Sequence, residues 1–170
     1  MSLFRRKCSL AELAAFCVAL IFSEEVLAES EKGLRLCNPE SPNRLSWELI
    51  VFRFFWARVG ILANLHDFRP ALDVLHLQFF EGIREANASV TRDDLASLEE
   101  FVHGRITEYE RLFNETVGAG ERLIKVGFQF GRFIGLGSES QVSAIPYVAP
   151  HASVYKTVTD FLNSVRVVVR

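Results

Sequence analysis

Two pairs of side chains in this sequence have the types and spacing of metal ligands, Asp73 with His76 and Glu100 with His103. A carboxylate and an imidazole three residues apart lie on one face of a helix and can share an ion, as Glu-x-x-His motifs do in di-iron bundles. The apolar pattern around them argues against such a site. Glu100 and His103 lie away from the apolar stripe of their segment, and Asp73 lies beyond the edge of its own. We therefore expect no metal site and no bound cofactor.

The dipeptide His66-Asp67 has the form of the histidine–aspartate pair of metal-dependent phosphohydrolases. That chemistry needs a further histidine upstream, and none of the four histidines precedes His66. We expect Asp67 to cap a helix and His66 to lie in the turn before it. Nucleophilic catalysis has no support either, because the sequence contains no Gly-x-Ser-x-Gly elbow and no phosphate-binding loop.

Arg53 and Arg58 lie inside the most apolar stretch of the chain, residues 47–68. A buried cation needs a partner, so each arginine is expected to meet a carboxylate or to extend to water along its apolar stem. The alternative is an anion-binding group at the floor of a pocket. With His66 and His76, these two arginines are the candidate ligand-binding residues.

The same stretch decides what kind of element holds the arginines. Glu48, Arg53 and Arg58 interrupt every window long enough to cross a bilayer, so a membrane span is not expected. On a helical wheel, small or polar residues occupy one narrow stripe and nearly all other positions are apolar. The stripe consists of Ser46, Arg53, Ala57, Gly60 and Asn64. We expect the central helix of a bundle, or a helix at an oligomer interface.

Periodicity predicts six helices. They cover residues 9–30, 44–65, 67–86, about six turns from residue 91, residues 120–136, and a last segment from about residue 153. Ser9 with Glu12 and Thr91 with Asp94 have the spacing of capping boxes. The valine-rich end of the last segment is compatible with helix or strand. The fold class is therefore all-α, a single domain over 1–170, built as an antiparallel bundle of about five to six helices with loops near 31–43 and 137–150.

Gly127, Gly131 and Gly135 lie four residues apart in the fifth predicted helix. Each glycine costs a helix about 1 kcal/mol relative to alanine, so a compensating close approach of another backbone is expected. Tight packing within the monomer is the simplest interpretation. A self-association surface, a slot for an apolar ligand, and a strand in place of the helix are the alternatives.

Composition limits the class of protein. The 170 residues are 49% hydrophobic with a net charge of −2, which is typical of a globular domain and gives no basic surface for nucleic acid. Three cysteines without CxxC spacing favour a reducing, cytoplasmic setting. Residues 1–28 resemble a secretory signal, so secretion is the alternative to a cytoplasmic location. Glu12, however, interrupts the apolar run that such a signal needs.

Two functions from different classes are compatible with these features. The preferred one is association without catalysis, as a homodimer or protein-interaction module, because 15 phenylalanines and a helix apolar nearly all round leave surplus apolar surface. The alternative is a binding protein or enzyme for a small apolar or anionic molecule, with a pocket between helices lined by Arg53, Arg58, His66 and His76. A pocket lined by aromatic side chains with two or more converging polar groups would favour the alternative.

Overall fold

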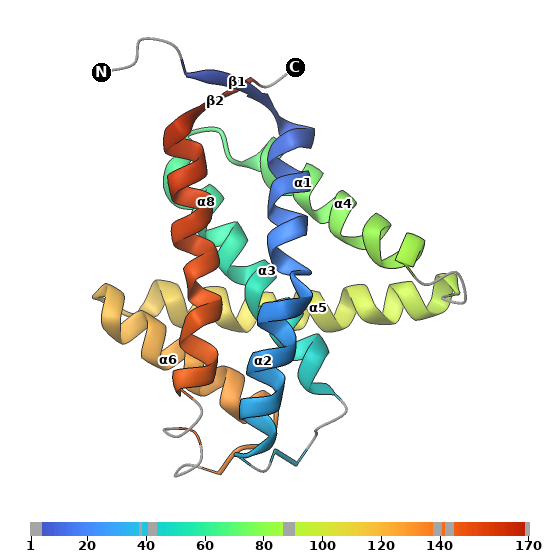
Figure 1. Ribbon diagram of the computed structural model, residues 1–170, viewed down its shortest axis with the longest axis vertical. Helices are drawn as coiled ribbons and strands as arrows, with labels where there is room; N and C mark the ends of the chain where they lie inside the picture. The colour runs from blue at the N-terminus through green and yellow to red at the C-terminus, as the bar shows by residue number, and fades with distance from the viewer. Residues whose placement is uncertain are drawn as a thin grey trace.

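The computed structural model describes residues 5–37, 39–40, 44–86, 91–137, 141 and 145–168. The predicted all-α bundle is confirmed, with one small two-stranded sheet added to it (Figure 1). The elements are β1 (Arg6–Ser9), α1 (Leu10–Ile21), α2 (Glu24–Arg35), α3 (Leu45–Asn64), α4 (Arg69–Ala86), α5 (Arg92–Glu115), α6 (Ala119–Phe133), the 3-10 helix η2 (Ala149–Ala152), α8 (Ser153–Ser164) and β2 (Val165–Val168).

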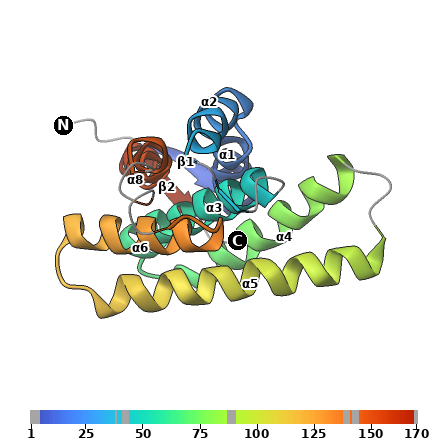
Figure 2. The ribbon, with the colours of Figure 1, turned by 90° about the horizontal axis from the view of Figure 1, so that it is seen from below.

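Helix α3 is the centre of the fold. Figure 2 shows it between one layer formed by α1, α2 and α8 and another formed by α5 and α6. It contacts each of the other α-helices whose bounds are given above, and 13 of its 20 residues are buried. A helix that is apolar nearly all round has no face to give to water, so this position follows from the sequence of α3. The prediction of an apolar central helix is confirmed.

The C-terminal end of the narrow stripe on α3, at Gly60 and Asn64, faces α8, which runs alongside α3 in the same direction (Figure 1). A Cβ atom built on Gly60 would lie 2.9 Å from Cβ of Val158 and 3.3 Å from the carbonyl oxygen of Tyr155. Asn64 continues the contact, because its side-chain amide donates to the Thr159 hydroxyl over 3.0 Å. The close approach of two helices that glycine permits therefore occurs at Gly60.

Replacing Gly60 by alanine is expected to lower the free energy of unfolding by roughly 1–2 kcal/mol. The added methyl group must push α8 away, which outweighs the gain in helix propensity. Gly127→Ala is the matched control, since no described atom lies within 4 Å of a Cβ at that position in α6. The control should raise stability by about 0.5–1 kcal/mol. Urea unfolding measures both, and equal effects of the two substitutions would contradict the close packing at Gly60.

The first predicted helix is two helices, which corrects the expected single helix over residues 9–30. The capping box of Ser9 and Glu12 starts α1 as expected, but α1 ends at Ile21 and α2 begins after Ser23. The guanidinium group of Arg53, on α3, donates to the backbone carbonyls of Leu20 and Ser23 at this break. The carbonyl of Leu20 lies in the last turn of α1, where carbonyl groups lack partners within the helix, and the buried arginine donates to it.

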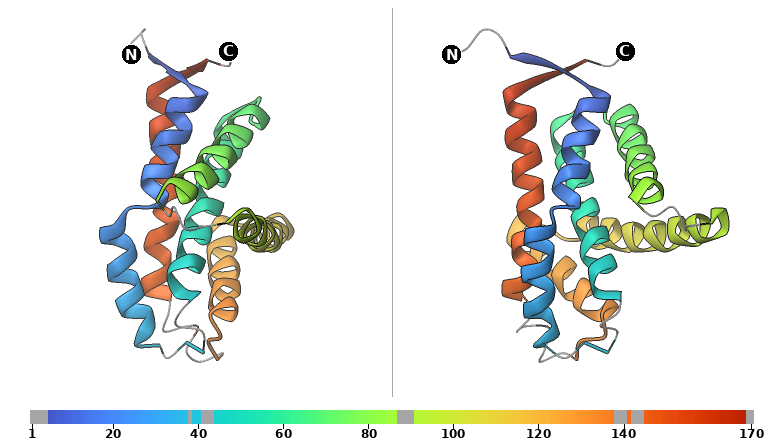
Figure 3. Two further views of the ribbon diagram at one scale, coloured as in Figure 1. Left: turned by 90° about the vertical axis from the view of Figure 1, so that its right-hand side faces the viewer. Right: turned by 45° about the vertical axis from the view of Figure 1, so that its right-hand side comes forward.

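Helix α5 is the longest helix and agrees with its prediction. Thr91 and Asp94 form the expected capping box, and Val102, Ile106 and Tyr109 are its buried residues. Figure 3 shows α5 crossing the direction of α1 and α8, with its N-terminal half extending beyond the other helices. Its C-terminal half packs on α3 and α6.

Helix α6 ends at Phe133, earlier than the predicted 136, because Gly135 adopts a left-handed φ of 76°. This conformation is common just after a helix C-cap and places Gly135 beside the side chain of Glu40. Gly131 is buried against the side chain of Gln141, at 3.0 Å from a built Cβ. The three glycines therefore do not share one backbone contact among the described residues.

The two ends of the described chain meet in a parallel sheet. Strand β1 pairs with β2 in the register Arg6 to Val165 through Ser9 to Val168. Figures 1 and 3 show the two strands beside each other at the ends of α1 and α8. Three valines in β2 favour extended backbone and resolve the ambiguous tail as strand after Ser164. The pairing itself was not predicted, because nothing in β1 taken alone indicates a strand.

Candidate functional site

A pocket that combines aromatic, aliphatic and charged side chains lies between the C-terminal half of α3, the start of α4, the end of α5, and the side chains of Arg122 and Tyr155. Its volume is about 580 Å³, within the range of roughly 300–1,000 Å³ typical of small-molecule sites. A second hollow of about 270 Å³ shares Val59, Phe113, Arg122 and Tyr155 with it, so the two hollows adjoin and are described together. We call this the inter-helix pocket. Its walls are mainly apolar: Phe55, Val59, Leu62, Phe68, Leu72 and Phe113.

One side of the inter-helix pocket carries an ion pair. Nε and Nη2 of Arg58 donate to one carboxylate oxygen of Glu110 over 3.1 and 2.7 Å. The two side chains are 19% and 33% exposed, so the pair is largely shielded from water. The expectation that Arg58 meets a structural carboxylate is confirmed.

Arg122 is the second cation of the inter-helix pocket, and two contacts hold its guanidinium group in place. Its Nε donates to the backbone carbonyl of Thr116 over 2.8 Å. Its guanidinium carbon lies 4.6 Å from the centre of the Phe113 ring, within cation–π range. Sequence reasoning missed Arg122, since its segment is polar on that face and gives no sign of a pocket.

Three aromatic side chains close the inner end of the pocket. Trp56 meets Phe113 edge to face at a centroid distance of 6.0 Å, and it meets Tyr155 at 6.4 Å. The indole Nε1 of Trp56 is buried and has no hydrogen-bond partner among the described residues. The fixed rings and the two cations give a site that could bind an apolar molecule and orient it by charge.

Arg53 points away from this pocket and is 97% buried on the opposite side of α3. Burial lowers the pKa of Arg53 to about 10. His151, in η2, is fully buried, and neither ring nitrogen has a partner among the described residues. Burial, followed by the positive charge of Arg53, lowers the pKa of His151 to about 4. The imidazole is therefore neutral in the folded protein at neutral pH.

The two histidines predicted to bind a ligand are exposed. His66 lies in the turn before α4, which begins at Arg69 with Phe68 rather than Asp67 preceding it. His76 packs against Phe80 and approaches a carboxylate oxygen of Glu99 to 3.5 Å. Of the four residues predicted to share a pocket, only Arg58 lines the inter-helix pocket. Arg53, Arg58 and His76 lie on α3 and α4, and His66 lies in the turn between them, so the structure does not bring the four together in one pocket.

In the described part of the chain, no group of three or more histidine, cysteine, aspartate or glutamate side chains could hold a metal ion. The three cysteines are free, and burial raises the pKa of the Cys17 thiol to about 12. A thiol with so high a pKa is a weak nucleophile at neutral pH.

An ion pair between a fully buried carboxylate, Glu48, and an arginine whose side chain is 23% exposed, Arg105, joins α3 to α5. Both carboxylate oxygens of Glu48 accept from Nε of Arg105, at 3.0 and 3.1 Å, and one also accepts from Nη2 at 2.8 Å. The guanidinium group of Arg105 lies between the rings of Phe101 and Phe133, 4.9 and 3.8 Å from their centres. This pair was not predicted, because its partners are far apart in the sequence.

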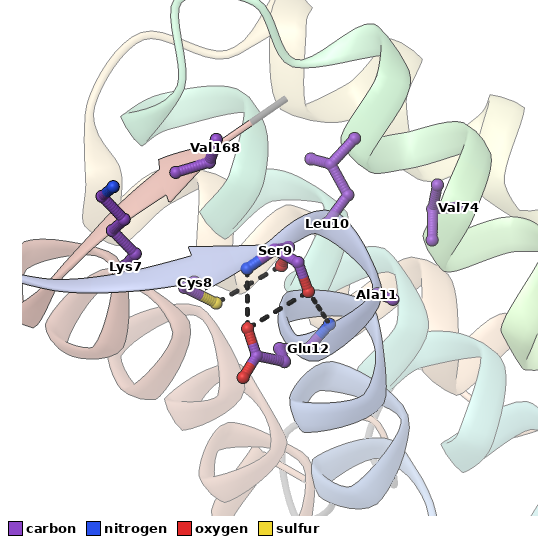
Figure 4. A pocket seen from close by; sticks show the side chains of 8 residues that line it. All are labelled: Lys7, Cys8, Ser9, Leu10, Ala11, Glu12, Val74 and Val168. Carbon is purple, nitrogen blue, oxygen red and sulfur yellow. Dashed lines mark hydrogen bonds between the residues drawn. The ribbon is translucent and has the colours of Figure 1, made fainter. Parts of the chain in front are cut away.

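A separate pocket of about 480 Å³ lies where β1 meets α1 (Figure 4). Ser9 and Glu12 point toward each other there and Val74 lies across from them on α4. The Glu12 carboxylate accepts from the Ser9 backbone N–H over 2.7 Å, and this bond holds the pKa of Glu12 below its usual value. Burial raises the pKa of the Cys8 thiol. These groups cap α1 and leave little chemistry for a ligand.

Comparison with known proteins assigns the chain to no family. No protein-family model, curated protein sequence or solved structure matches the chain. In the described residues, no helix is at once long enough and apolar enough to cross a membrane.

Proposed function

We propose that the protein binds a small apolar molecule in the inter-helix pocket. The observation that carries this proposal is the meeting, in one cavity of about 580 Å³, of aromatic and aliphatic walls with Arg58, Glu110 and Arg122. Few polar groups among many apolar ones are typical of sites that bind and orient small molecules. Among the described lining residues there is no serine, cysteine or histidine, so binding is proposed rather than a reaction.

Self-association, the function preferred from the sequence, receives less support. The large apolar side chains that are exposed among the described residues come from different segments of the chain: Leu36, Trp47, Leu77, Val117 and Ile124. The N-terminal half of α5 favours association most, because Leu95, Leu98 and Phe101 are only half-buried there. Homo-oligomer formation stays a prediction that a measurement of mass in solution tests.

The neutral fluorescent probe N-phenyl-1-naphthylamine tests the proposed function. Its emission rises in an apolar site, and we expect saturable binding of one probe per chain. Ala63 is exposed at the edge of the pocket, so Ala63→Trp should fill the entrance and weaken binding by about tenfold, a loss of roughly 1.4 kcal/mol.

Ala96→Trp is the matched control for this experiment. Ala96 is an exposed alanine of α5 that lines none of the pockets described above, and the substitution should leave probe binding unchanged. Absence of saturable binding, or equal binding by the two variants, would contradict the proposed function.

A further inference from the structure

The charges that line the inter-helix pocket do not balance. Arg58 and Arg122 contribute two positive charges and Glu110 contributes one negative charge, which leaves one positive charge in excess. Since Glu110 accepts two hydrogen bonds from Arg58, the excess charge belongs to Arg122.

Acidic side chains next to the pocket in sequence are engaged elsewhere. Glu115, at the end of α5, lies 2.6 Å from a guanidinium nitrogen of Arg111. Glu121, adjacent to Arg122, lies 2.8 Å from the ammonium group of Lys125. Glu115 shares Arg111 with Glu108, and Glu121 pairs with Lys125, so neither carboxylate pairs with Arg122.

The geometry of Arg122 suits an incoming acceptor. One edge of its guanidinium group is used, because Nε donates to the Thr116 carbonyl. Its face is used as well, because it lies over Phe113. In the described part of the structure, neither Nη atom has a hydrogen-bond acceptor. A guanidinium group held in this way loses little conformational freedom when it binds a carboxylate.

We propose that the ligand of the inter-helix pocket is an amphipathic carboxylate, with its apolar body between α3, α4 and α8 and its carboxylate on Arg122. This inference rests on the proposed function and adds the chemical class of the ligand. One negative charge restores neutrality in the pocket, while a neutral or cationic ligand leaves Arg122 without an anion. Apolar atoms of the ligand contact the aromatic wall of Trp56, Phe113 and Tyr155.

Displacement of N-phenyl-1-naphthylamine by three molecules with the same ten-carbon chain tests the charge preference on the unmodified protein. We expect decanoate to displace the probe at a concentration about tenfold lower than decanol does, since a charge-assisted hydrogen bond contributes about 1.5 kcal/mol or more. Decylamine should be the weakest competitor. Equal potency of decanoate and decanol, or stronger displacement by decylamine, would overturn the inference. The proposed function would survive that result, because it depends on probe binding alone.

Arg122→Gln locates the charge preference. In this variant, decanoate and decanol should displace the probe at about equal concentrations, each judged against the variant's own affinity for the probe. Arg111→Gln is the matched control, because Arg111 is an arginine of α5 that pairs with Glu108 and Glu115 and does not line the pocket. Retention of the decanoate preference in Arg122→Gln would show that Arg122 does not hold the carboxylate.

Discussion

Arg105→Met is expected to lower the free energy of unfolding by about 3–5 kcal/mol, more than any other substitution considered for this protein. The Glu48 carboxylate has no surface exposed to water, and the variant removes its three hydrogen bonds to Arg105. A buried charge without its partner carries its full desolvation cost. Urea unfolding, followed by circular dichroism, measures the loss.

The double variant Glu48→Met, Arg105→Met is the control that separates the charge from the packing. With both charges removed, methionine side chains fill a similar volume between α3 and α5, and most of the lost stability should return. The explanation fails if the double variant is as unstable as Arg105→Met alone. A loss below about 1 kcal/mol in the single variant would contradict it as well, since that is the cost of an exposed ion pair.

Acid is expected to remove about 3 kcal/mol of stability through His151 alone. The pKa of His151 is lowered from 6.5 to about 4 in the folded protein. Between these two pH values the imidazole is protonated in the unfolded chain and neutral in the folded protein. A group with a lowered pKa of this kind contributes its full stability above about pH 6.5, and loses it progressively as the pH falls toward about 4. Unfolding measured by urea at a series of pH values shows this slope.

His151→Leu should flatten the dependence of stability on pH between about 6.5 and 5, because leucine fills the same buried space without titrating. Carboxylates whose pKa is lowered, such as Glu31 beside Ser46 and Asp94 beside Thr91, affect stability mainly below that range. His103→Gln, at an exposed position of α5, serves as the matched control and should keep the slope. An unchanged slope in His151→Leu would contradict a neutral, buried imidazole.

Local signals in the sequence predicted the elements that depend on local physics. The capping boxes of α1 and α5 were predicted from four residues each, and the apolar stripe of α5 from its helical period. The central position of α3 followed from the apolar residues around its whole circumference. These features need no knowledge of the rest of the chain.

Features that depend on distant partners were not predicted. The break between α1 and α2 involves Arg53, thirty or more residues further along the chain. The inter-helix pocket takes residues from α3, α4, α5, α6 and α8, and no single segment indicates it. Glycines were assigned to close packing by their spacing in α6, whereas the contact of helices occurs at Gly60, a single glycine on α3. The spacing of residues predicts which face of a helix they share, but it does not predict which neighbouring element packs on that face.

The pairing of β1 with β2 has a mechanical consequence. Because the two strands are parallel, β1 begins at one end of the small sheet and β2 finishes at the opposite end (Figure 3). Tension applied to the chain before Arg6 and after Val168 therefore pulls the two parallel strands lengthwise past each other. In that geometry the hydrogen bonds between the strands, which are evenly spaced in a parallel pair, bear the load together. The strand pair must therefore shear before the tension is transmitted to α1 and α8.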